Sequence, residues 1–414
     1  MQIVVIGYVW PEPNSSAAGQ NMLNLLEAFT ARNCSVTFLS AASESVHALD
    51  LAAIGVASMS IALNHDSFNA VIAELNPDLV VFDRFMIEEQ FAWRVRKVCP
   101  DALCVLNTED LHALRDARHQ QLKRQQSDIQ LTSDLFLREI ASILRCDMTL
   151  LVSEHERQFL LEHFPFTASL LWVYPLLPAF AESITPTFKQ RKDYVFIGNF
   201  RHAPNWDAVL QLKQLWPSIR NKTPTAELHI YGAYPPPKAT QLHAPKAGFH
   251  IDGWVQDAHQ VLKNARVCIA PLRFGAGVKG KFLDAFQTGT PCVTSPIGIE
   301  GICAPQQWPG AVSSNDESFC NSAARLYLDQ NSWQRAHQKA ISMAKTNDDR
   351  RVQNNALCDA LKAQLETLET HRQNNFLGAM LRHHQHASTQ YMSQWIASKT
   401  ALKELRDSLP TDPK

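Results

Sequence analysis

Residues 266–301 are the stretch that most constrains the fold (ARVCIAPLRFGAGVKGKFLDAFQTGTPCVTSPIGIEG). The apolar run at 267–271 predicts a buried strand, and a second run follows at 292–295. A glycine-containing loop and a helical pattern at 282–287 lie between them. Strand, loop, helix and strand form one βαβ unit, so the chain must contain a parallel sheet covered by helices.

The loop of this unit is suited to an anionic ligand. Gly275 and Gly277 let backbone N–H groups approach a ligand closely, and the start of the following helix adds a partial positive charge. Lys279 and Lys281 beside that helix end suit a diphosphate. Asp284, one turn into the helix, is placed to accept hydrogen bonds from a ribose or sugar hydroxyl.

Strand-like apolar runs recur along the chain, with helical patterns between most of them. They lie at 2–6, 35–40, 57–63, 79–83, 103–106, 148–152, 170–174, 194–197, 227–231, 250–251, 267–271 and 292–295. This alternation predicts doubly wound parallel sheets. Because 414 residues suffice for two such cores, we predict two Rossmann-like domains facing across a cleft.

Prolines mark the boundary between the two domains. Pro175, Pro178 and Pro186 interrupt regular structure between two strand patterns. The predicted organisation is an N-terminal domain, a linker, a second domain and a helical extension, at 1–176, 177–192, 193–345 and 346–414.

Composition excludes several classes of protein. A net charge of −1 and a charged fraction of 19% provide no field for nucleic acid, so we expect no nucleic-acid partner. Nine cysteines without a C-x-x-C pair are typical of reduced thiols in a cytosolic protein. The N-terminus predicts a first strand and not a signal peptide, and no apolar run is long enough to span a membrane. We therefore expect a cytoplasmic protein.

Polar residues that follow strands supply further site candidates in the first half. The loop at 8–19, which ends in Gly19, lies where α/β proteins bind ligands. Asp110 and His112 could orient an acceptor hydroxyl. Ser153 with Glu156 fits a helix capping box. The polar, Gln-rich residues 118–133 form either a loop or an exposed helix.

The second domain opens with another strand, glycine and basic loop. The guanidinium of Arg201 can grip a phosphate with two hydrogen bonds. Asn205 or Asp207 fits the N-cap of the next helix.

The segment GAGVKGKFLDAFQTGTPCVTSPIGIEGI resembles the donor site of retaining GT-B glycosyltransferases of family 4 (group 1). That family has G-x-G-x-K-x-K-x-x-E-A, then G-x-P-V-V and G-x-E-G. Residues 107–115 are similar to the family's D-x-x-D-L-H-x-L-R, and 198–207 to its F-x-G-x-F-x-x-x-P-N-x-D-A. Two positions depart from the pattern, since Asp284 replaces the usual Glu and Ala276 replaces an acid.

The resemblance, which covers roughly residues 1–345, implies a GT-B fold whose late helix packs back on the N-terminal domain. It implies transfer of a sugar from a nucleotide-sugar to an acceptor hydroxyl with retention of configuration, in bacterial surface polysaccharide or glycoconjugate synthesis. The acceptor would be a glycan, a lipid-linked molecule or a small molecule, and neither a metal nor a cofactor is needed beyond the nucleotide-sugar. The implied catalytic residues are Asp110, His112 and Asp284. The implied donor-binding residues are Gly19, Arg201, Gly277, Lys279, Lys281, Asp284 and Glu300.

Two other functions stay open. Residues 275–280 also spell G-x-G-x-x-G with Glu300 about 20 residues on, as in an NAD-linked oxidoreductase. The departures at Ala276 and Asp284 are compatible with a non-catalytic nucleotide-sugar-binding protein. In the tail, His383, His384 and His386 suggest a metal, but no carboxylate or thiol spacing accompanies them, so a solvated or partner-facing helix fits better. Peripheral membrane contact is a further alternative that the mixed charges of the tail do not favour.

Overall fold

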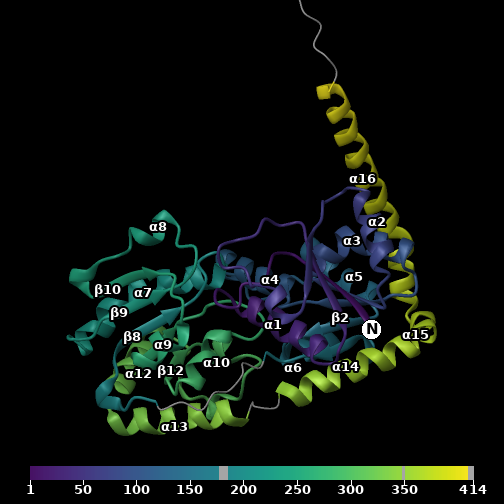
Figure 1. Ribbon diagram of the computed structural model, residues 1–414. Helices are drawn as coiled ribbons and strands as arrows, with labels where there is room; N and C mark the ends of the chain where they lie inside the picture. The colour runs from purple at the N-terminus through teal and green to yellow at the C-terminus, as the bar shows by residue number, and fades with distance from the viewer. Residues whose placement is uncertain (177–184, 347–349, 409–414) are drawn as a thin grey trace, which may run out of the picture.

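The computed structural model describes residues 1–176, 185–346 and 350–408, which form two α/β domains and a helical extension (Figure 1). Each domain is built on a parallel sheet, with strand orders β3-β2-β1-β4-β5-β6-β7 and β10-β9-β8-β11-β12-β13. The predicted fold class is confirmed. Among the described residues, no helix combines the length and the apolar character needed to cross a membrane.

The N-terminal domain holds the first seven strands. They are β1 (Gln2–Gly7), β2 (Ser35–Ser40), β3 (Ala57–Ser60), β4 (Leu79–Asp83), β5 (Leu103–Asn107), β6 (Met148–Leu151) and β7 (Leu171–Val173). The helices are α1 (Ala17–Thr30), α2 (Ser67–Leu75), α3 (Phe85–Val98), α4 (His112–Arg124), α5 (Asp134–Arg145) and α6 (Glu154–His163). The Gln-rich segment is thus helical as far as Arg124 and a loop afterwards.

The C-terminal domain begins with β8, one residue before the predicted domain start. Its strands are β8 (Lys192–Ile197), β9 (Leu228–Tyr231), β10 (Phe249–Gly253), β11 (Ala265–Ala270), β12 (Cys292–Thr294) and β13 (Gly310–Val312). Its helices are α7 (Ala203–Lys222), α8 (Pro237–Thr240), α9 (Ala258–Asn264), α10 (Gly280–Gln287), α11 (Pro296–Ile299), α12 (Asp316–Leu328) and α13 (Gln330–Thr346). Five 3-10 segments complete the two domains: Ala52–Ile54, Ala168–Leu170, Phe188–Gln190, Pro245–Ala247 and Pro305–Gln307.

The central strands are apolar throughout because helices cover both faces of each sheet. Residues 3–6 of β1 are fully buried, and alternate side chains enter opposite cores. Val4 and Ile6 pack with Phe91 of α3, whereas Ile3 and Val5 pack with Leu25 of α1. Polar side chains are therefore displaced to the strand ends, where the loops gather.

The extension returns to the N-terminal domain. It comprises α14 (Arg350–Glu366), α15 (Leu368–Asn374) and α16 (Phe376–Ser408). Leu357 and Leu361 of α14 are buried in the same core as α1, and Arg372 pairs with Asp147. Figure 1 shows the start of α16 beside the N-terminal domain and the remainder projecting away from it.

Candidate functional site

A cleft of about 770 Å³ separates the carboxyl ends of the two sheets. Loops that follow β1, β4 and β5 line one wall, and loops that follow β8, β9, β10 and β11 line the other. Parallel sheets place all these loops at one edge, which is where open α/β sheets bind ligands. Most of the predicted site residues line this cleft: Gly19, Asp110, His112, Arg201, Lys279, Lys281 and Asp284.

Two lysines make the C-terminal wall cationic. The ammonium of Lys281 donates to Asn205 Oδ1 at 2.5 Å, and that of Lys279 donates to the carbonyl of Gly277 at 2.9 Å. Lys279 Nζ also lies 3.9 Å from Glu300 Oε2. Burial lowers the pKa of both lysines to about 8. Both can therefore be protonated at neutral pH, and an anion in the cleft would favour that form.

The first turn of α10, which carries Lys281, lies against the N-terminal domain. Its N-cap residue, Lys279, makes no side-chain capping bond. A Cβ at Gly280 would lie 2.9 Å from the Cβ of Ala17, so the absence of a side chain permits this close approach. The helix start thus presents N–H groups and its dipole at the cleft.

Arg201 lies at the other side of the same wall. Its guanidinium stacks 3.6 Å over the ring of Tyr234. The Tyr234 hydroxyl donates to both carboxylate oxygens of Glu12, at 2.8 and 3.1 Å. Because Glu12 belongs to the loop after β1, this contact joins the two domains beside Arg201.

Asp284 has a partner that the sequence analysis missed. Its Oδ1 lies 3.4 Å from His259 Nε2. The hydrogen bond to Asp284 raises the pKa of His259. The pair therefore offers an acceptor and a donor to the hydroxyls of a sugar.

On the N-terminal wall, Asp110 and His112 lie side by side. His112 Nδ1 is 3.3 Å from Asp110 Oδ1 and 3.0 Å from the Asp110 carbonyl. Burial lowers the pKa of His112, which favours the neutral ring. Burial alone would raise the pKa of Asp110, but Arg115, His112 and His202 outweigh it and lower that pKa. A carboxylate beside a neutral imidazole suits the orientation of a hydroxyl.

Buried polar residues at the ends of strands lie next to this pair; they were predicted as cleft positions but not as catalytic or donor-binding residues. Glu109 accepts hydrogen bonds from Asn107 at 2.8 Å and from Asn21 at 3.3 Å, and burial raises its pKa to about 8. Glu109 and Arg84 both have positive φ, at 63° and 73°. Such strained backbone concentrates at functional sites. Polar residues at the ends of apolar strands were the signal available in the sequence.

Three predicted donor-binding residues make contacts that position the loops. A Cβ at Gly19 would lie 2.3 Å from the backbone of Glu12. Gly277 has φ +65°, and its N–H donates to Glu156 Oε1 at 3.0 Å. Glu300 accepts from Arg118 of α4 at 2.7 and 3.0 Å.

These contacts argue against a dinucleotide site. The carboxylate of Glu300 is engaged by Arg118, so it is not free to bind a ribose. The glycine loop follows β11, the fourth strand of its domain in chain order, whereas a dinucleotide fingerprint follows the first.

The capping predictions need correction. Ser153 accepts the N–H of Glu156 at 3.3 Å, but the Glu156 carboxylate does not complete a capping box. It accepts from the N–H groups of Leu111 and Gly277, one in each domain, and burial raises its pKa to about 7. If the Glu156 carboxylate capped its own helix, the N–H groups of Leu111 and Gly277 would lose this buried acceptor and be left unpaired.

Neither proposed residue caps α7. The N-cap is His202, which makes no side-chain capping bond. Asn205 donates to the carbonyl of Asn199 at 3.0 Å and accepts from Lys281. Asp207 pairs with Arg273. The helix begins too early for either side chain to reach its free N–H groups, and both serve the surrounding loops.

Comparisons with known proteins agree with this geometry. Residues 191–329 match the family model described as Glycosyl transferases group 1. No curated protein sequence matches the chain significantly.

Similar solved structures share the fold at low identity. Sucrose-phosphate synthase from Thermosynechococcus elongatus has a TM-score of 0.64 at 14% identity, covering 87% of this chain and 99% of that one. WaaG, a glycosyltransferase involved in lipopolysaccharide biosynthesis, has a TM-score of 0.63 at 13% identity, covering 87% of this chain and 99% of that one. The pneumococcal O-GlcNAc transferase GtfA, in complex with UDP and GlcNAc, has a TM-score of 0.66 at 10% identity, covering 88% of this chain and 99% of that one. The chain therefore has the GT-B fold of these glycosyltransferases, and its match to the group 1 family model covers residues 191–329.

Proposed function

We propose that this protein transfers a sugar from a nucleoside-diphosphate sugar to an acceptor hydroxyl, with retention of configuration. The observation that carries the proposal is the convergence of Lys279, Lys281, Arg201 and the uncapped start of α10 on one wall of the cleft. Asp110 and His112 line the opposite wall. A structural neighbour solved with UDP supports a nucleoside diphosphate as the ligand.

The cationic wall would stabilise the negative charge that develops on the departing diphosphate. Preorganised donors in a cleft contribute about 2.7–4 kcal/mol each to transition-state stabilisation. Two lysines, one arginine and a helix dipole supply that charge from protein groups, so we propose transfer without a metal ion. Asp284 with His259 would bind a hydroxyl of the ribose or of the transferred sugar.

The N-terminal wall would bind the acceptor. Asp110, as a carboxylate, would orient the neutral ring of His112, which in turn accepts a hydrogen bond from the attacking hydroxyl. Lipopolysaccharide biosynthesis in one neighbour supports a glycan or lipid-linked acceptor in surface polysaccharide or glycoconjugate synthesis. Small-molecule acceptors fit the same chemistry.

A donor panel tests the proposal. The melting temperature is measured with UDP-, GDP-, ADP- and dTDP-sugars and with NAD, because a ligand that binds the native state raises it. One nucleotide-sugar should stabilise the protein and release free nucleotide in EDTA, whereas NAD should do neither. Stabilisation without any nucleotide release would favour the non-catalytic binding protein, and stabilisation by NAD alone would overturn the proposal.

We place the protein in the cytoplasm, with peripheral membrane contact through α16. Tyr391, Trp395 and Leu402 of this helix are each more than half exposed. Exposed aromatic and aliphatic side chains on a helix suit the membrane interface. Co-sedimentation with phosphatidylglycerol vesicles should fall at least about fivefold in Trp395→Glu. Equal vesicle binding by the variant and the wild type would contradict the proposed membrane contact.

A further inference from the structure

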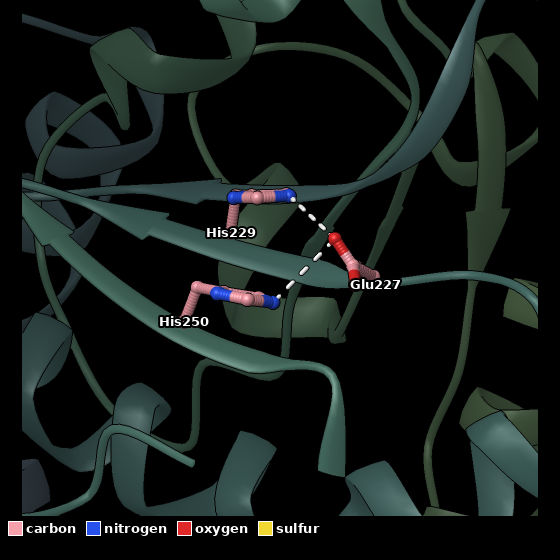
Figure 2. Close-up of side chains that lie close together, drawn as sticks. All are labelled: Glu227, His229 and His250. Carbon is pink, nitrogen blue, oxygen red and sulfur yellow. Dashed lines mark ion pairs between the residues drawn. The ribbon is translucent and has the colours of Figure 1, made fainter. Parts of the chain in front are cut away.

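Two imidazoles and one carboxylate lie together on the C-terminal sheet, away from the cleft. Glu227 immediately precedes β9 and His229 lies within it, so the extended backbone turns both side chains to one face. His250 of β10 lies in register with His229. Figure 2 shows the three side chains converging. The cleft residues 232–234 follow the opposite end of β9.

The separations fit metal ligands better than hydrogen bonds. Glu227 Oε2 lies 3.6 Å from His229 Nε2 and 3.5 Å from His250 Nε2. All three ligand atoms lie within 4.8 Å of one another. Protein N–H···O hydrogen bonds are shorter, at about 2.7–3.2 Å. Bonds of about 2.0–2.2 Å to a tetrahedral zinc ion separate neighbouring ligand atoms by about 3.3 Å.

The surroundings of the two rings turn one nitrogen of each toward the proposed metal position. His229 Nδ1 donates to Asp252 Oδ2 at 2.9 Å, so Nε2 is the nitrogen that faces Glu227 and would bind an ion. The hydrogen bond with Asp252 also raises the pKa of His229, so a metal ion would displace a proton from Nε2. A carboxylate on the far nitrogen of a metal-binding histidine is the usual outer partner. His250 Nε2 is buried and has no hydrogen-bond partner among the described residues. A buried ring nitrogen without a partner calls for a ligand, since leaving it unpaired costs free energy.

The cluster is also accessible. The side chains of Glu227 and His229 are 44% and 26% exposed, so an ion can enter from solvent. The rings of His229 and His250 stack with centroids 4.7 Å apart, and the edge of His243 meets His250 at 5.6 Å. The two rings would tilt toward each other to bring the three ligand atoms, now within 4.8 Å of one another, onto one ion.

We propose that Glu227, His229 and His250 bind a divalent transition-metal ion, with Zn²⁺ as the best match. Two imidazoles and one carboxylate are zinc ligands, and a tetrahedral ion would keep its fourth position for water or for a group from a partner. The ion would link edge strand β10 to β9. The site is separate from the cleft, so it does not depend on the proposed sugar transfer.

The test is a Zn²⁺ titration of the full chain in competition with a chromophoric chelator, at about pH 7.5, because the ligands bind in their deprotonated forms. The wild type should bind one ion that His250→Ala loses, with an affinity drop of at least about hundredfold. Asp252→Asn, which keeps all three ligands, should lose about 10- to 100-fold. Zinc should raise the melting temperature of the wild type and not that of His250→Ala.

The histidines of the tail provide the matched control. A variant with His383→Ala, His384→Ala and His386→Ala should keep the strong site, because the proposed ligands are Glu227, His229 and His250. Circular dichroism of each metal-free variant checks that it folds. Equal stoichiometry and affinity in the wild type and a folded His250→Ala would overturn the proposal, as would loss of the strong site in the tail variant alone.

Discussion

Lys281 differs from Lys279 in the partner of its ammonium group. Its ammonium donates to the neutral amide of Asn205 and lies 4.6 Å from the ring centre of Phe196. Lys279, in contrast, lies near the carboxylate of Glu300. A lysine whose charge is not offset by a carboxylate partner has the most to gain from a bound diphosphate.

Replacing this lysine should remove much of the transition-state stabilisation. We expect Lys281→Met to lower kcat by about 10²–10³-fold, as for the loss of one preorganised donor. Release of free nucleotide from the donor identified by the panel is the measurement. Lys246→Met is the matched control, because Lys246 is exposed and lies outside the cleft. An active Lys281→Met would contradict the assignment.

The depressed lysine pKa values predict a pH dependence of binding. Burial lowers the pKa of Lys279 and Lys281 to about 8, below the usual lysine value, so each loses its proton as the pH rises through 8. A nucleoside diphosphate binds the protonated form. Its Kd should therefore rise from pH 7 to pH 9, by about tenfold for each lysine that must be charged.

Calorimetric titration at the two pH values measures this change. Lys281→Met should show a smaller pH dependence than the wild type, because one of the two titrating groups is gone. A Kd that stays constant from pH 7 to pH 9 in the wild type would contradict the lysine pKa values.

At the scale of elements, α4 of one domain holds the glycine loop of the other. Arg118 donates to both carboxylate oxygens of Glu300 and, at 2.7 Å, to the carbonyl of Gly275. His119 of the same helix stacks on Phe274 with ring centroids 4.2 Å apart. The glycine loop of the C-terminal domain is thus held by a helix of the N-terminal domain.

Loss of this contact should weaken donor binding. We expect Arg118→Gln to raise the donor KM by about tenfold, since a hydrogen-bonded charge contributes about 1.5–3 kcal/mol. The control is Arg124→Gln at the exposed end of the same helix, which should leave KM unchanged. The donor KM of both variants is measured by steady-state kinetics with the donor that the panel identifies. Equal KM values for the two variants would show that Arg118 does not support the loop.

At the scale of the whole molecule, the chain crosses twice between its halves. The linker leads from the first domain to the second, and α14 returns to pack beside α1. Arg350 pairs with Glu27, and the hydroxyl of Tyr174 donates to Asn354 at 2.8 Å. The extension therefore belongs to the core of the N-terminal domain.

This return predicts a stability effect far along the chain. Leu361 is fully buried, so Leu361→Ala should lower the free energy of unfolding by about 2–5 kcal/mol. Leu402→Ala on exposed α16 should change it by less than about 0.5 kcal/mol. Urea denaturation of both variants measures the difference. A nearly unchanged stability in Leu361→Ala would mean that α14 is not part of this core.

Local patterns in the sequence were enough to predict the parallel sheets, their alternating helices and the edge at which the loops gather. An apolar run, a glycine loop and a helix are properties of neighbouring residues, so periodicity and turn residues reveal them. The loops at 8–19 and 275–281 were predicted this way, whereas the bounds of 107–115 and 198–207 came from the family resemblance. Each of the four segments contributes residues to the cleft.

What each polar group does there was decided only by the tertiary structure. Glu300 pairs with Arg118, Glu156 accepts the N–H of Gly277, and His229 lies in register with His250, in each case between residues far apart in the sequence. The positive φ of Arg84 and Glu109 likewise has no signature in residue type. Apolar burial can be read along the chain because it is nearly non-directional, whereas hydrogen bonds and ion pairs require a particular partner at a particular distance, and folding alone supplies that partner.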